Sequence, residues 1–322
     1  MDFLRVVLVV LLGAVVSGLL TFLEIPFLKN HQFKQYIRED GPSSHQKKAG
    51  TPTMGGLAMI AALVIVTFAM VGISKISILM LVVTLLLGGI GFMDDYIKVA
   101  AKHNLGLTAK QKLALQLLLG IALGVYIRFF TDLGTAVYIP FYGKQVNFGA
   151  LYIPFVAFVL VAMANSVNLT DGLDGLCSGV TAIVAFFFAL MGLKLGQASP
   201  TSFSAALCGV CLGFLVFNKN PAKLFMGDTG SMALGSAVAV ITIVMKMEFF
   251  LLIAGFIYVM ESLSVIIQVI SFQTRGKRIF RMSPIHHHFE LGGMSEKNVV
   301  FMFWGVTLVC SLLAYAIFLL RA

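Results

Sequence analysis

The sequence is poor in charged residues, and this scarcity excludes an ordinary water-soluble fold. Only 11% of its 322 residues are Asp, Glu, Lys or Arg, whereas 59% are hydrophobic and the mean hydropathy is +0.97. Soluble domains carry about 25% charged residues. Since so apolar a core has no place in water, we expect lipid to be its solvent.

Cysteine is scarce as well, and the four cysteines define neither a disulfide framework nor a zinc site. Cys208 and Cys211 form a C-x-x-C pair, but both lie in an apolar run and no second pair completes a metal site. We interpret them as small buried residues. The pattern contains no soluble domain, low-complexity tract or convincing repeat, so it predicts a single membrane domain over residues 1–322.

Long apolar runs dominate what is present, and they predict an all-α membrane protein. A transmembrane helix needs about 20 apolar residues. The gaps between charged residues predict about ten spans, at 6–23, 54–72, 76–93, 113–131, 149–166, 175–193, 203–218, 231–246, 249–271 and 299–320. The first has no cleavage site before Glu24, so we interpret it as a retained helix and not a signal peptide. The alternating pattern in loop 132–148 predicts a short β-hairpin.

The basic residues are distributed unevenly between the predicted loops. The net charge of +9 would suggest a nucleic-acid partner for a soluble protein, but here orientation in the membrane explains it better and we expect no nucleic acid. With ten spans, 16 of the 23 Lys and Arg fall on one side, in loops 24–53, 94–112, 165–174, 219–230 and 272–298. The positive-inside rule therefore predicts that these loops are cytoplasmic and that both termini lie outside.

Adjacent carboxylates occur where the third predicted span leaves the membrane. Asp94 and Asp95 follow a long apolar run, and repulsion between them is relieved most easily by a shared cation or proton. On a continuing helix, Lys98 lies about one turn further and can screen both. A charged helix end at the membrane surface is the alternative interpretation.

Two further polar segments interrupt the apolar pattern on the same side. In 165–175, capping of a helix end by Thr170 or Asp171 would explain one residue but not the whole cluster. In 217–231, Asp228 precedes a predicted span, where a carboxylate can ligate a metal while backbone N–H groups receive phosphate oxygens. Phe225 is a candidate for stacking on a nucleobase. A helix cap and an interfacial anchor are the alternatives for these two residues.

Three consecutive histidines, His286 to His288, follow a basic cluster from Arg275 to Arg281. Consecutive histidines cannot all face one ion, so we favour binding of phosphate groups over a zinc site. Attraction of the basic cluster to anionic lipid is the alternative.

A polar stripe is predicted on one face of the ninth span, formed by Glu261, Ser264, Gln268 and Ser271. Packing between helices and contact with substrate explain it equally well. Together, the polar segments predict one site at the cytoplasmic border of the membrane. Mg²⁺ takes one or two carboxylates plus substrate phosphates, so such a border suits transfer from a soluble phosphorylated donor to a lipid phosphate.

Four motifs, in this order, resemble the signatures of the polyprenyl-phosphate N-acetylhexosamine-1-phosphate transferase superfamily. They are Asp94-Asp95-x-x-Lys98, Asn168-x-Thr170-Asp171-Gly172-x-Asp174-Gly175, Asn218-x-x-Pro221-Ala222 with Phe225-Met226-Gly227-Asp228, and Pro284-Ile285-His286-His287-His288-Phe289-Glu290. The last motif, with Thr51-Pro52-Thr53-Met54-Gly55-Gly56, resembles the MraY branch of that superfamily.

The resemblance implies a Mg²⁺-dependent reaction in the bacterial plasma membrane. Phospho-MurNAc-pentapeptide would pass from UDP-MurNAc-pentapeptide to undecaprenyl phosphate, giving lipid I and UMP. The resemblance implies that Asp228 is the Mg²⁺ ligand and that Asp94, with Asp95 beside it, acts on the lipid phosphate. Whether Asp94 is a base or a covalent nucleophile stays open. The family also implies a homodimer.

The same resemblance assigns substrate contacts. Lys48, Asp174 and Phe225 resemble the uridine pocket. The residues expected at the donor and its phosphates are Thr53, Lys98, Lys110, Asn168, Asp171, Asn218, Gln268, His286, His287 and His288.

Other functions remain as alternatives. A sister transferase with another UDP-sugar would share most of the motifs, although the triple histidine disfavours it by resemblance. A cation-coupled transporter would place its acids near the membrane midplane on paired repeats, whereas here they lie at one surface. A structural scaffold would not need clustered acids.

Overall fold

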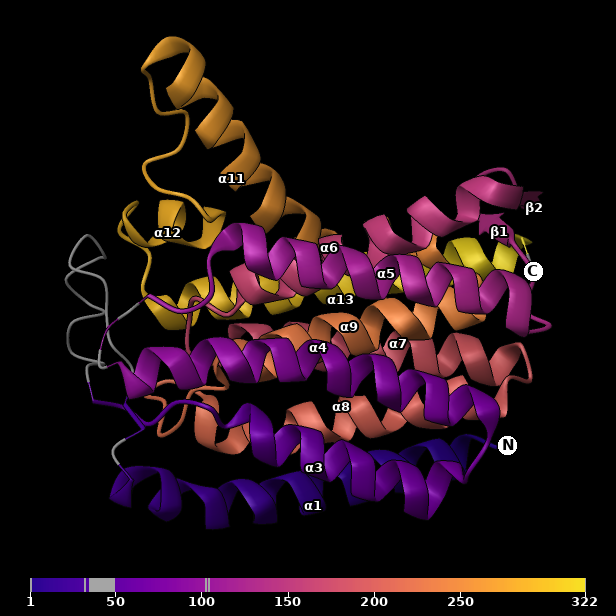
Figure 1. The fold of residues 1–322 in the computed structure, drawn as a ribbon, viewed down its shortest axis with the longest axis horizontal. Coiled ribbons are helices and arrows are strands. Elements are labelled where there is room, and N and C mark those ends of the chain that lie inside the picture. Colours follow the sequence, from indigo (N-terminus) through magenta and orange to yellow (C-terminus); the bar gives the residue numbers. More distant parts are fainter. Residues whose placement is uncertain (1, 32, 35–49, 102, 104, 322) are drawn as a thin grey trace.

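The computed structural model describes residues 2–31, 33–34, 50–101, 103 and 105–321. These residues form a helical bundle with one β-hairpin (Figure 1). The long helices are α1 (Phe3–Asn30), α4 (Lys75–Ala100), α5 (Ala109–Phe130), α6 (Tyr152–Thr170), α7 (Leu176–Lys194), α8 (Ala198–Asn218), α9 (Gly227–Met245), α11 (Phe256–Arg275) and α13 (Glu296–Arg321). The short helices are α3 (Gly56–Val66), α10 (Leu251–Ala254) and α12 (Ile285–Glu290), with single turns η1 (Thr67–Val71), η2 (Gly149–Leu151) and η3 (Glu248–Phe250).

The predicted membrane architecture is confirmed, with two differences in detail. Among the described residues, nine helices are long and apolar enough to cross a membrane. The predicted span 54–72 is a shorter apolar helix, Gly56–Met70, whose last turn is π-helical. The predicted span 249–271 is broken at Gly255, where α10 ends and α11 begins. The predicted hairpin is present, with β1 (Ala136–Ile139) antiparallel to β2 (Lys144–Asn147).

Helix α9 lies at the centre of the bundle. In its most apolar stretch of 18 residues, 94% is buried inside the protein. The helix packs against α3, α4, α6 and α8. A helix that is apolar all round is stable only when it is surrounded. By contrast, only 28% of the corresponding stretch is buried in each of α1, α5 and α13, as expected for helices that face lipid.

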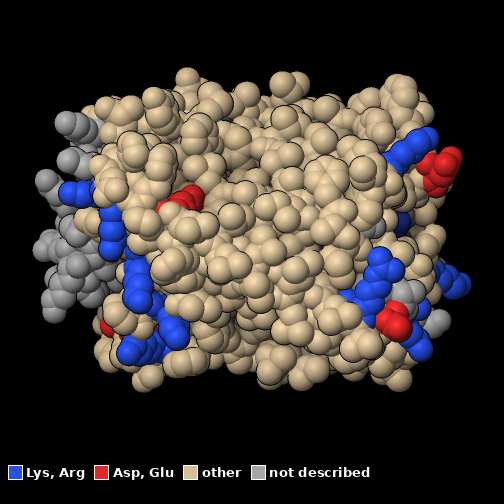
Figure 2. Space-filling model, turned by 90° about the horizontal axis from the view of Figure 1, so that it is seen from below, with Lys and Arg blue, Asp and Glu red and all other residues tan. Residues whose placement is uncertain are grey.

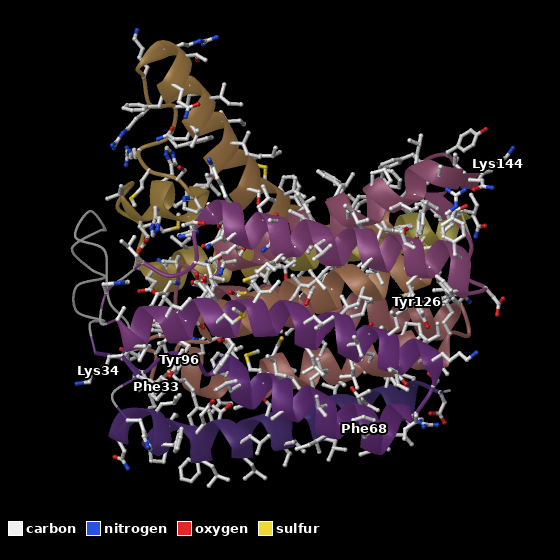
Figure 3. All side chains as sticks on the ribbon, in the orientation of Figure 1. Phe33, Lys34, Phe68, Tyr96, Tyr126 and Lys144 are labelled. Atoms are coloured by element: carbon white, nitrogen blue, oxygen red, sulfur yellow. The ribbon has the colours of Figure 1, made fainter. Side chains whose placement is uncertain are left out.

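Charged residues gather at the two ends of the bundle and leave an uncharged belt between them (Figure 2). Both termini lie at the end that carries the β-hairpin (Figure 1). Lys34 lies at one end and Lys144 at the other (Figure 3). The described parts of the loops predicted to share a side lie at the same end (Figure 1), whereas which end faces the cytoplasm stays a prediction.

Two glycines allow the helices around α9 to approach it closely. A Cβ atom on Gly91 of α4 would collide with the carbonyl of Asp228, and one on Gly56 of α3 would collide with the backbone of Gly230. Backbone-to-backbone contact of this kind is typical of membrane helices, where small residues take the place of a hydrophobic driving force. The contact brings the polar end of α4 against the first turn of α9.

Candidate active site

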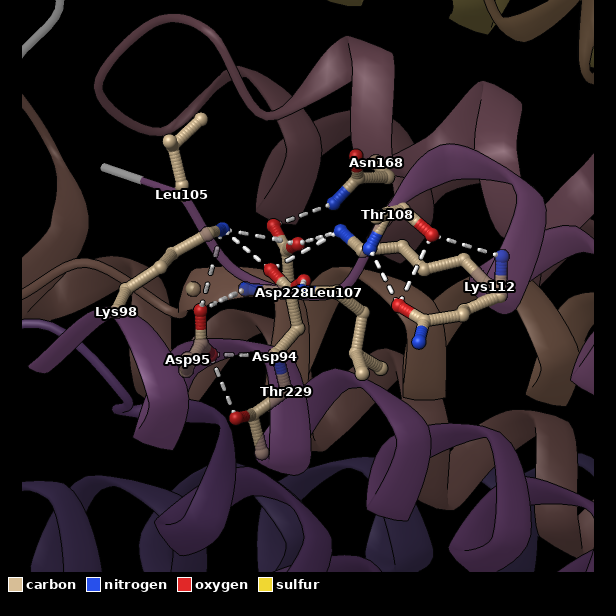
Figure 4. Close-up of polar contacts among 12 residues, drawn as sticks. Asp94, Asp95, Lys98, Leu105, Leu107, Thr108, Lys112, Asn168, Asp228 and Thr229 are labelled. Atoms are coloured by element: carbon tan, nitrogen blue, oxygen red, sulfur yellow. Dashed lines mark hydrogen bonds and ion pairs between the residues drawn. The ribbon is translucent and has the colours of Figure 1, made fainter. Parts of the chain in front are cut away.

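Three aspartates meet where the C-terminal end of α4 lies against the first turn of α9 (Figure 4). Asp94 and Asp95 lie near the C-terminal end of α4, and Asp228 lies in the first turn of α9. One carboxylate oxygen of each lies within 4.8 Å of the others. This arrangement confirms that the two acidic motifs, 133 residues apart from Asp95 to Asp228, form one cluster.

Asp95 caps α9 from the neighbouring helix. Its Oδ1 accepts the backbone N–H of Asp228 at 3.1 Å, and its Oδ2 accepts the N–H and hydroxyl of Thr229 at 2.8 and 2.7 Å. The first N–H groups of a helix have no partner within it, so an external carboxylate satisfies them and complements the helix dipole. Both oxygens of Asp95 are thus bonded to the first turn of α9, so this side chain holds Asp228 in position.

Asp94 is completely buried between two lysines and a loop. Its Oδ2 lies 2.5 Å from Nζ of Lys98 and 3.0 Å from Nζ of Lys112, and its Oδ1 accepts the N–H of Leu107 at 2.6 Å. A Cβ atom on Gly106 would collide with this carboxylate. The glycine therefore lets the loop before α5 close over Asp94.

Asp228 is the more accessible acid of the cluster, with 17% of its side chain exposed. Its Oδ2 accepts from Lys112 at 2.6 Å and from Lys98 at 3.2 Å, while its Oδ1 accepts from the amide of Asn168 at 2.9 Å. Lys98 and Lys112 approach from opposite sides (Figure 4). Their side chains are 29% and 22% exposed, so both lysines are partly open to solvent.

The cluster fits a magnesium ion in its chemistry. Three carboxylates and two lysines leave one net negative charge, and hard oxygen ligands are those that Mg²⁺ prefers. Asp95 is committed to the helix cap, so Asp228 and Asp94 are the residues that would hold the ion.

Comparison of the sequence with known proteins shows which family this chain resembles. The glycosyl transferase family 4 profile matches residues 77–246, and a phospho-N-acetylmuramoyl-pentapeptide-transferase signature matches residues 48–60. The transferase of that name from Halalkalibacterium halodurans is 50% identical over 311 residues, which is 95% of each chain. Those from Bacillus subtilis and a Thermoanaerobacter species are 49% and 48% identical, covering 94% and 95% of this chain and 95% and 98% of theirs.

The chain belongs to the phospho-N-acetylmuramoyl-pentapeptide-transferase family. Its matched region contains both acidic motifs and Asn168, and the matched signature contains Thr53. In this transferase the structure brings together five of the predicted site residues, namely Asp94, Asp95, Lys98, Asn168 and Asp228.

Two other predicted residues of this transferase form an internal scaffold beside the cluster. Asp174 Oδ2 accepts from the side chain of Asn220 at 3.1 Å and the N–H of Ala222 at 3.0 Å. Asn218 accepts the N–H of Gly175 at 3.1 Å and donates to the carbonyl of Leu224 at 3.0 Å. These bonds join the turn after α6 to the loop before α9, so the two residues shape the site whether or not they also bind substrate.

Glu296 completes that scaffold and was not predicted from the sequence. Its two oxygens accept the N–H of Asp174 at 2.8 Å and the amide of Asn220 at 3.0 Å. At the start of α13, a glutamate is expected for its interaction with the helix dipole alone. Nothing in the pattern therefore distinguished Glu296 from an ordinary first-turn acid.

The three histidines of the transferase point to three different partners. The Nδ1 of His286 lies 3.0 Å from Glu261, and the Nδ1 of His287 lies 3.0 Å from Glu290. His288 Nδ1 accepts the N–H of Arg281 at 3.1 Å. This agrees with the expectation that consecutive histidines do not share one ion.

The remaining predicted residues lie around the same end of the bundle. The half-buried Phe225 pairs its backbone with Pro52 and Gly55 at 2.9 Å, which holds the signature segment against the loop before α9. Beside Gly227, the hydroxyl of the buried Thr53 has no hydrogen-bond partner among the described residues. No position is described for Lys48, and Asp171 ends α6 as its C-terminal cap residue.

Both ends of the Gln268 side-chain amide form hydrogen bonds with backbone groups. Its Oε1 accepts the N–H groups of Ile279 and Phe280 at 2.9 and 3.0 Å, and its Nε2 donates to the carbonyl of Phe280 at 3.0 Å. Ser271 likewise donates to the carbonyl of Lys277 at 2.8 Å. The polar stripe of α11 thus holds the chain that leads to the histidines, which supports the packing interpretation for these two residues.

Lys112, and not the predicted Lys110, contacts the acidic cluster. Lys110 is exposed, and two residues along a helix correspond to a rotation of about 200°. The sequence does contain a signal for Lys112, since it lies one turn before Gln116 and two turns before Gly120, both buried on the inner face of α5. Extending that stripe of small and polar residues toward the start of the helix would have selected Lys112.

Proposed function

We propose that this protein transfers phospho-MurNAc-pentapeptide from UDP-MurNAc-pentapeptide to undecaprenyl phosphate, giving lipid I and UMP. The observation that carries the proposal is the cluster of three aspartates and two lysines, found in a chain that is about half identical to transferases of that name over 95% of its length. Such a cluster at the end of a membrane bundle meets a water-soluble donor and a lipid acceptor together.

The two lysines are suited to hold phosphate groups. Their ammonium groups lie on Asp94 and Asp228, and their side chains are partly exposed, so phosphate oxygens of the donor and acceptor can share these lysines. In the proposed reaction, an oxygen of the lipid phosphate forms a bond to the sugar-linked phosphorus of the donor. The bond between that phosphorus and the bridging oxygen breaks, and UMP leaves with the electron pair.

Asp94 is the candidate proton acceptor for the lipid phosphate. It lies between Lys98 and Lys112, and water has no access to it. General-base assistance accelerates a reaction by about 10²–10⁴-fold. When bound at Asp228 and Asp94, Mg²⁺ would act as a Lewis acid on the pyrophosphate. The role of Asp95 in this scheme is to hold α9, and therefore Asp228, in place.

The decisive experiment measures transfer of radiolabel from UDP-MurNAc-pentapeptide into a butanol-soluble lipid by the purified protein. UDP-N-acetylglucosamine serves as the competing donor, which tests the sister-transferase alternative. We expect label in the lipid only with the first donor, and only with a divalent cation. Label from UDP-N-acetylglucosamine alone would overturn the proposed donor.

We also propose that the acidic cluster faces the cytoplasm, with the β-hairpin outside. The distribution of basic residues, 16 of 23 on the side of the cluster, supports this orientation. Cysteine placed at Gly292 should react with a membrane-impermeant thiol reagent only in opened cells. Cysteine at Gly143 in the hairpin should react in intact cells. Reversed labelling would overturn the orientation, while the homodimer implied by the family stays a separate prediction for sedimentation in detergent.

A further inference from the structure

Glu261 and His286 form a buried pair beside the acidic cluster. Glu261 lies on α11 and His286 in the first turn of α12, and both are almost inaccessible, with 0% and 1% of their surface exposed. Glu261 Oε1 and His286 Nδ1 are 3.0 Å apart. Glu261 is the member of the α11 polar stripe that reaches a side chain of the triple-histidine motif, whereas Gln268 and Ser271 hold backbone.

The pair fixes which nitrogen of His286 carries a proton. A carboxylate accepts, so Nδ1 must donate, and the ring then presents its other nitrogen, Nε2, away from Glu261. Nε2 is buried and has no hydrogen-bond partner among the described residues. A buried carboxylate is also costly unless a positive charge or hydrogen bonds compensate it. When both ring nitrogens carry a proton, Nδ1–H donates to Glu261 while Nε2–H is free to donate to an anion.

The unpartnered nitrogen is aimed at the turn that follows α6. A Cβ atom on Gly172 would fall on Nε2 and Cε1 of His286, so only glycine lets the imidazole lie against this turn. The turn directly continues the helix whose Asn168 donates to Asp228 at 2.9 Å. His286 thus lies against the segment whose Asn168 holds Asp228, the most accessible acid of the cluster.

We propose that Glu261 is a positioning residue for the transferase reaction, which orients His286 so that Nε2 donates a hydrogen bond to a phosphate oxygen of the sugar-nucleotide donor beside Gly172. The inference rests on the proposed function, because it concerns the donor of that reaction. Glu261 does not touch the donor itself. Its effect passes through His286, as a carboxylate behind a metal-bound histidine acts through the ring it orients.

The test is a double-mutant cycle on donor kinetics. Glu261→Gln, His286→Ala and the double variant are compared with wild type, and Ser264→Ala is the matched control. Ser264 lies on the same face of α11 and is equally buried, and among the described residues its hydroxyl bonds only the carbonyl of Glu261. We expect Glu261→Gln to lower kcat/KM for UDP-MurNAc-pentapeptide by about 10–100-fold, the usual size of the loss when a histidine loses the carboxylate that orients it. KM for the lipid should be unchanged.

The cycle distinguishes positioning from a purely structural role. If Glu261 acts through His286, Glu261→Gln has little further effect in the His286→Ala background, and Glu261→Asp recovers part of the activity. The ¹⁵N chemical shifts of His286 should also change in Glu261→Gln, since they report which ring nitrogen is protonated. Independent losses in the cycle, or unchanged ¹⁵N shifts, would overturn the inference.

Failure of this inference can be separated from failure of the proposed function. If wild-type protein transfers no label from UDP-MurNAc-pentapeptide, the function is wrong. If wild type is active and Glu261→Gln equals it, only the role of Glu261 is wrong. Should Glu261→Gln lose its fold, judged by its thermal midpoint against Ser264→Ala, the same cycle is run with Glu261→Asp, with the same expected non-additivity.

Discussion

The two ends of α9 each carry a cluster of lysine and acid, and the two clusters differ in charge balance. At the N-terminal end, Asp94, Asp95 and Asp228 face Lys98 and Lys112. At the other end, one lysine and one acid meet through a tyrosine: Lys246 donates to the hydroxyl of Tyr152 at 2.6 Å, and Tyr152 donates to Glu248 at 3.1 Å. The first cluster has one more acid than it has lysines, whereas the second has equal numbers of the two.

The clusters differ in access as well. Lys246, Glu248 and Tyr152 are at most 8% exposed, and Lys246 gives a further hydrogen bond to the carbonyl of Gly134 at 2.7 Å. The N–H of Tyr138 in β1 donates to the carbonyl of Lys246 at 3.1 Å. This cluster therefore fastens the β-hairpin to the end of α9. Its donors are used within the protein, whereas the lysines near Asp228 remain partly open to solvent.

The comparison shows how similar residue types serve opposite purposes. Balanced and buried charges whose donors are used within the protein hold structure, and removing one partner is expected to cost stability. Unbalanced charges that stay accessible retain affinity for a cation and for phosphates, and removing one is expected to cost activity. Each substitution below tests one side of this distinction.

Asp228→Asn should have the largest effect on activity. The substitution removes one negative charge and an oxygen ligand from a site with few protein ligands, so we expect it to abolish measurable transfer of radiolabel. The thermal midpoint should stay at the wild-type value, because the cap on α9 comes from Asp95. Wild-type activity in excess EDTA would remove the metal from the mechanism.

Asp94→Asn should lower kcat by about 10²–10⁴-fold, the range of general-base assistance, while binding of the UDP-substrate changes little. The second pKa of a phosphate monoester is about 6, so the lipid phosphate is largely a dianion at high pH. Raising the pH to about 9 should therefore partly rescue the variant. Exchange of labelled UMP into the UDP-substrate by wild type without lipid, with phosphosugar trapped on Asp94, would instead establish a covalent nucleophile.

Lys112→Met should reduce kcat/KM by about 10²-fold, since it removes a preorganised positive charge from the phosphates. Lys110→Met, on the opposite face of the same helix, should have a much smaller effect. Steady-state rates at saturating lipid measure both. A larger loss for Lys110→Met would restore the residue chosen from the sequence and remove Lys112 from the site.

Lys246→Met should act on stability alone. The substitution removes the positive charge that is linked to Glu248 through Tyr152, together with the hydrogen bonds to Tyr152 and Gly134. Loss of a buried charge partner costs about 3–5 kcal/mol, seen as a lower thermal midpoint in detergent. Transfer measured at low temperature should stay at the wild-type level, because this cluster lies at the opposite end of α9. Loss of transfer with an unchanged midpoint would show that the hairpin end takes part in function.

The smallest expected effect is the pH dependence of this same cluster. Burial raises the pKa of Glu248 from 4.5 to about 7 and lowers the pKa of Lys246 from 10.5 to about 8. The Glu248 contribution is thus present below pH 4.5 and lost as the pH rises toward 7, while the Lys246 contribution is lost as the pH falls from 10.5 toward 8. We expect this cluster to support the fold least between about pH 7 and 8. Glu248→Gln should flatten the change in thermal midpoint between pH 4.5 and 7.

The sequence by itself determined the membrane class, the β-hairpin and the end of the bundle that carries the acids. It also determined the number of spans, except that the predicted span 54–72 is a shorter helix, Gly56–Met70. These features follow from local composition, because the length of an apolar run and the distribution of basic residues act within single segments. The motifs also placed Asp94, Asp95 and Asp228 at one end of the bundle together with Asp171 and Asp174, of which only the first three form the cluster.

Only the tertiary structure decided what each polar residue does. It assigned Asp95 to the cap of α9, chose Lys112 over Lys110, and showed that Gln268 holds the backbone of Phe280. It also paired Glu261 with His286 across 25 residues of chain. A partner on another helix leaves no local pattern, because its position depends on how closely glycines such as Gly91 and Gly172 let two segments approach.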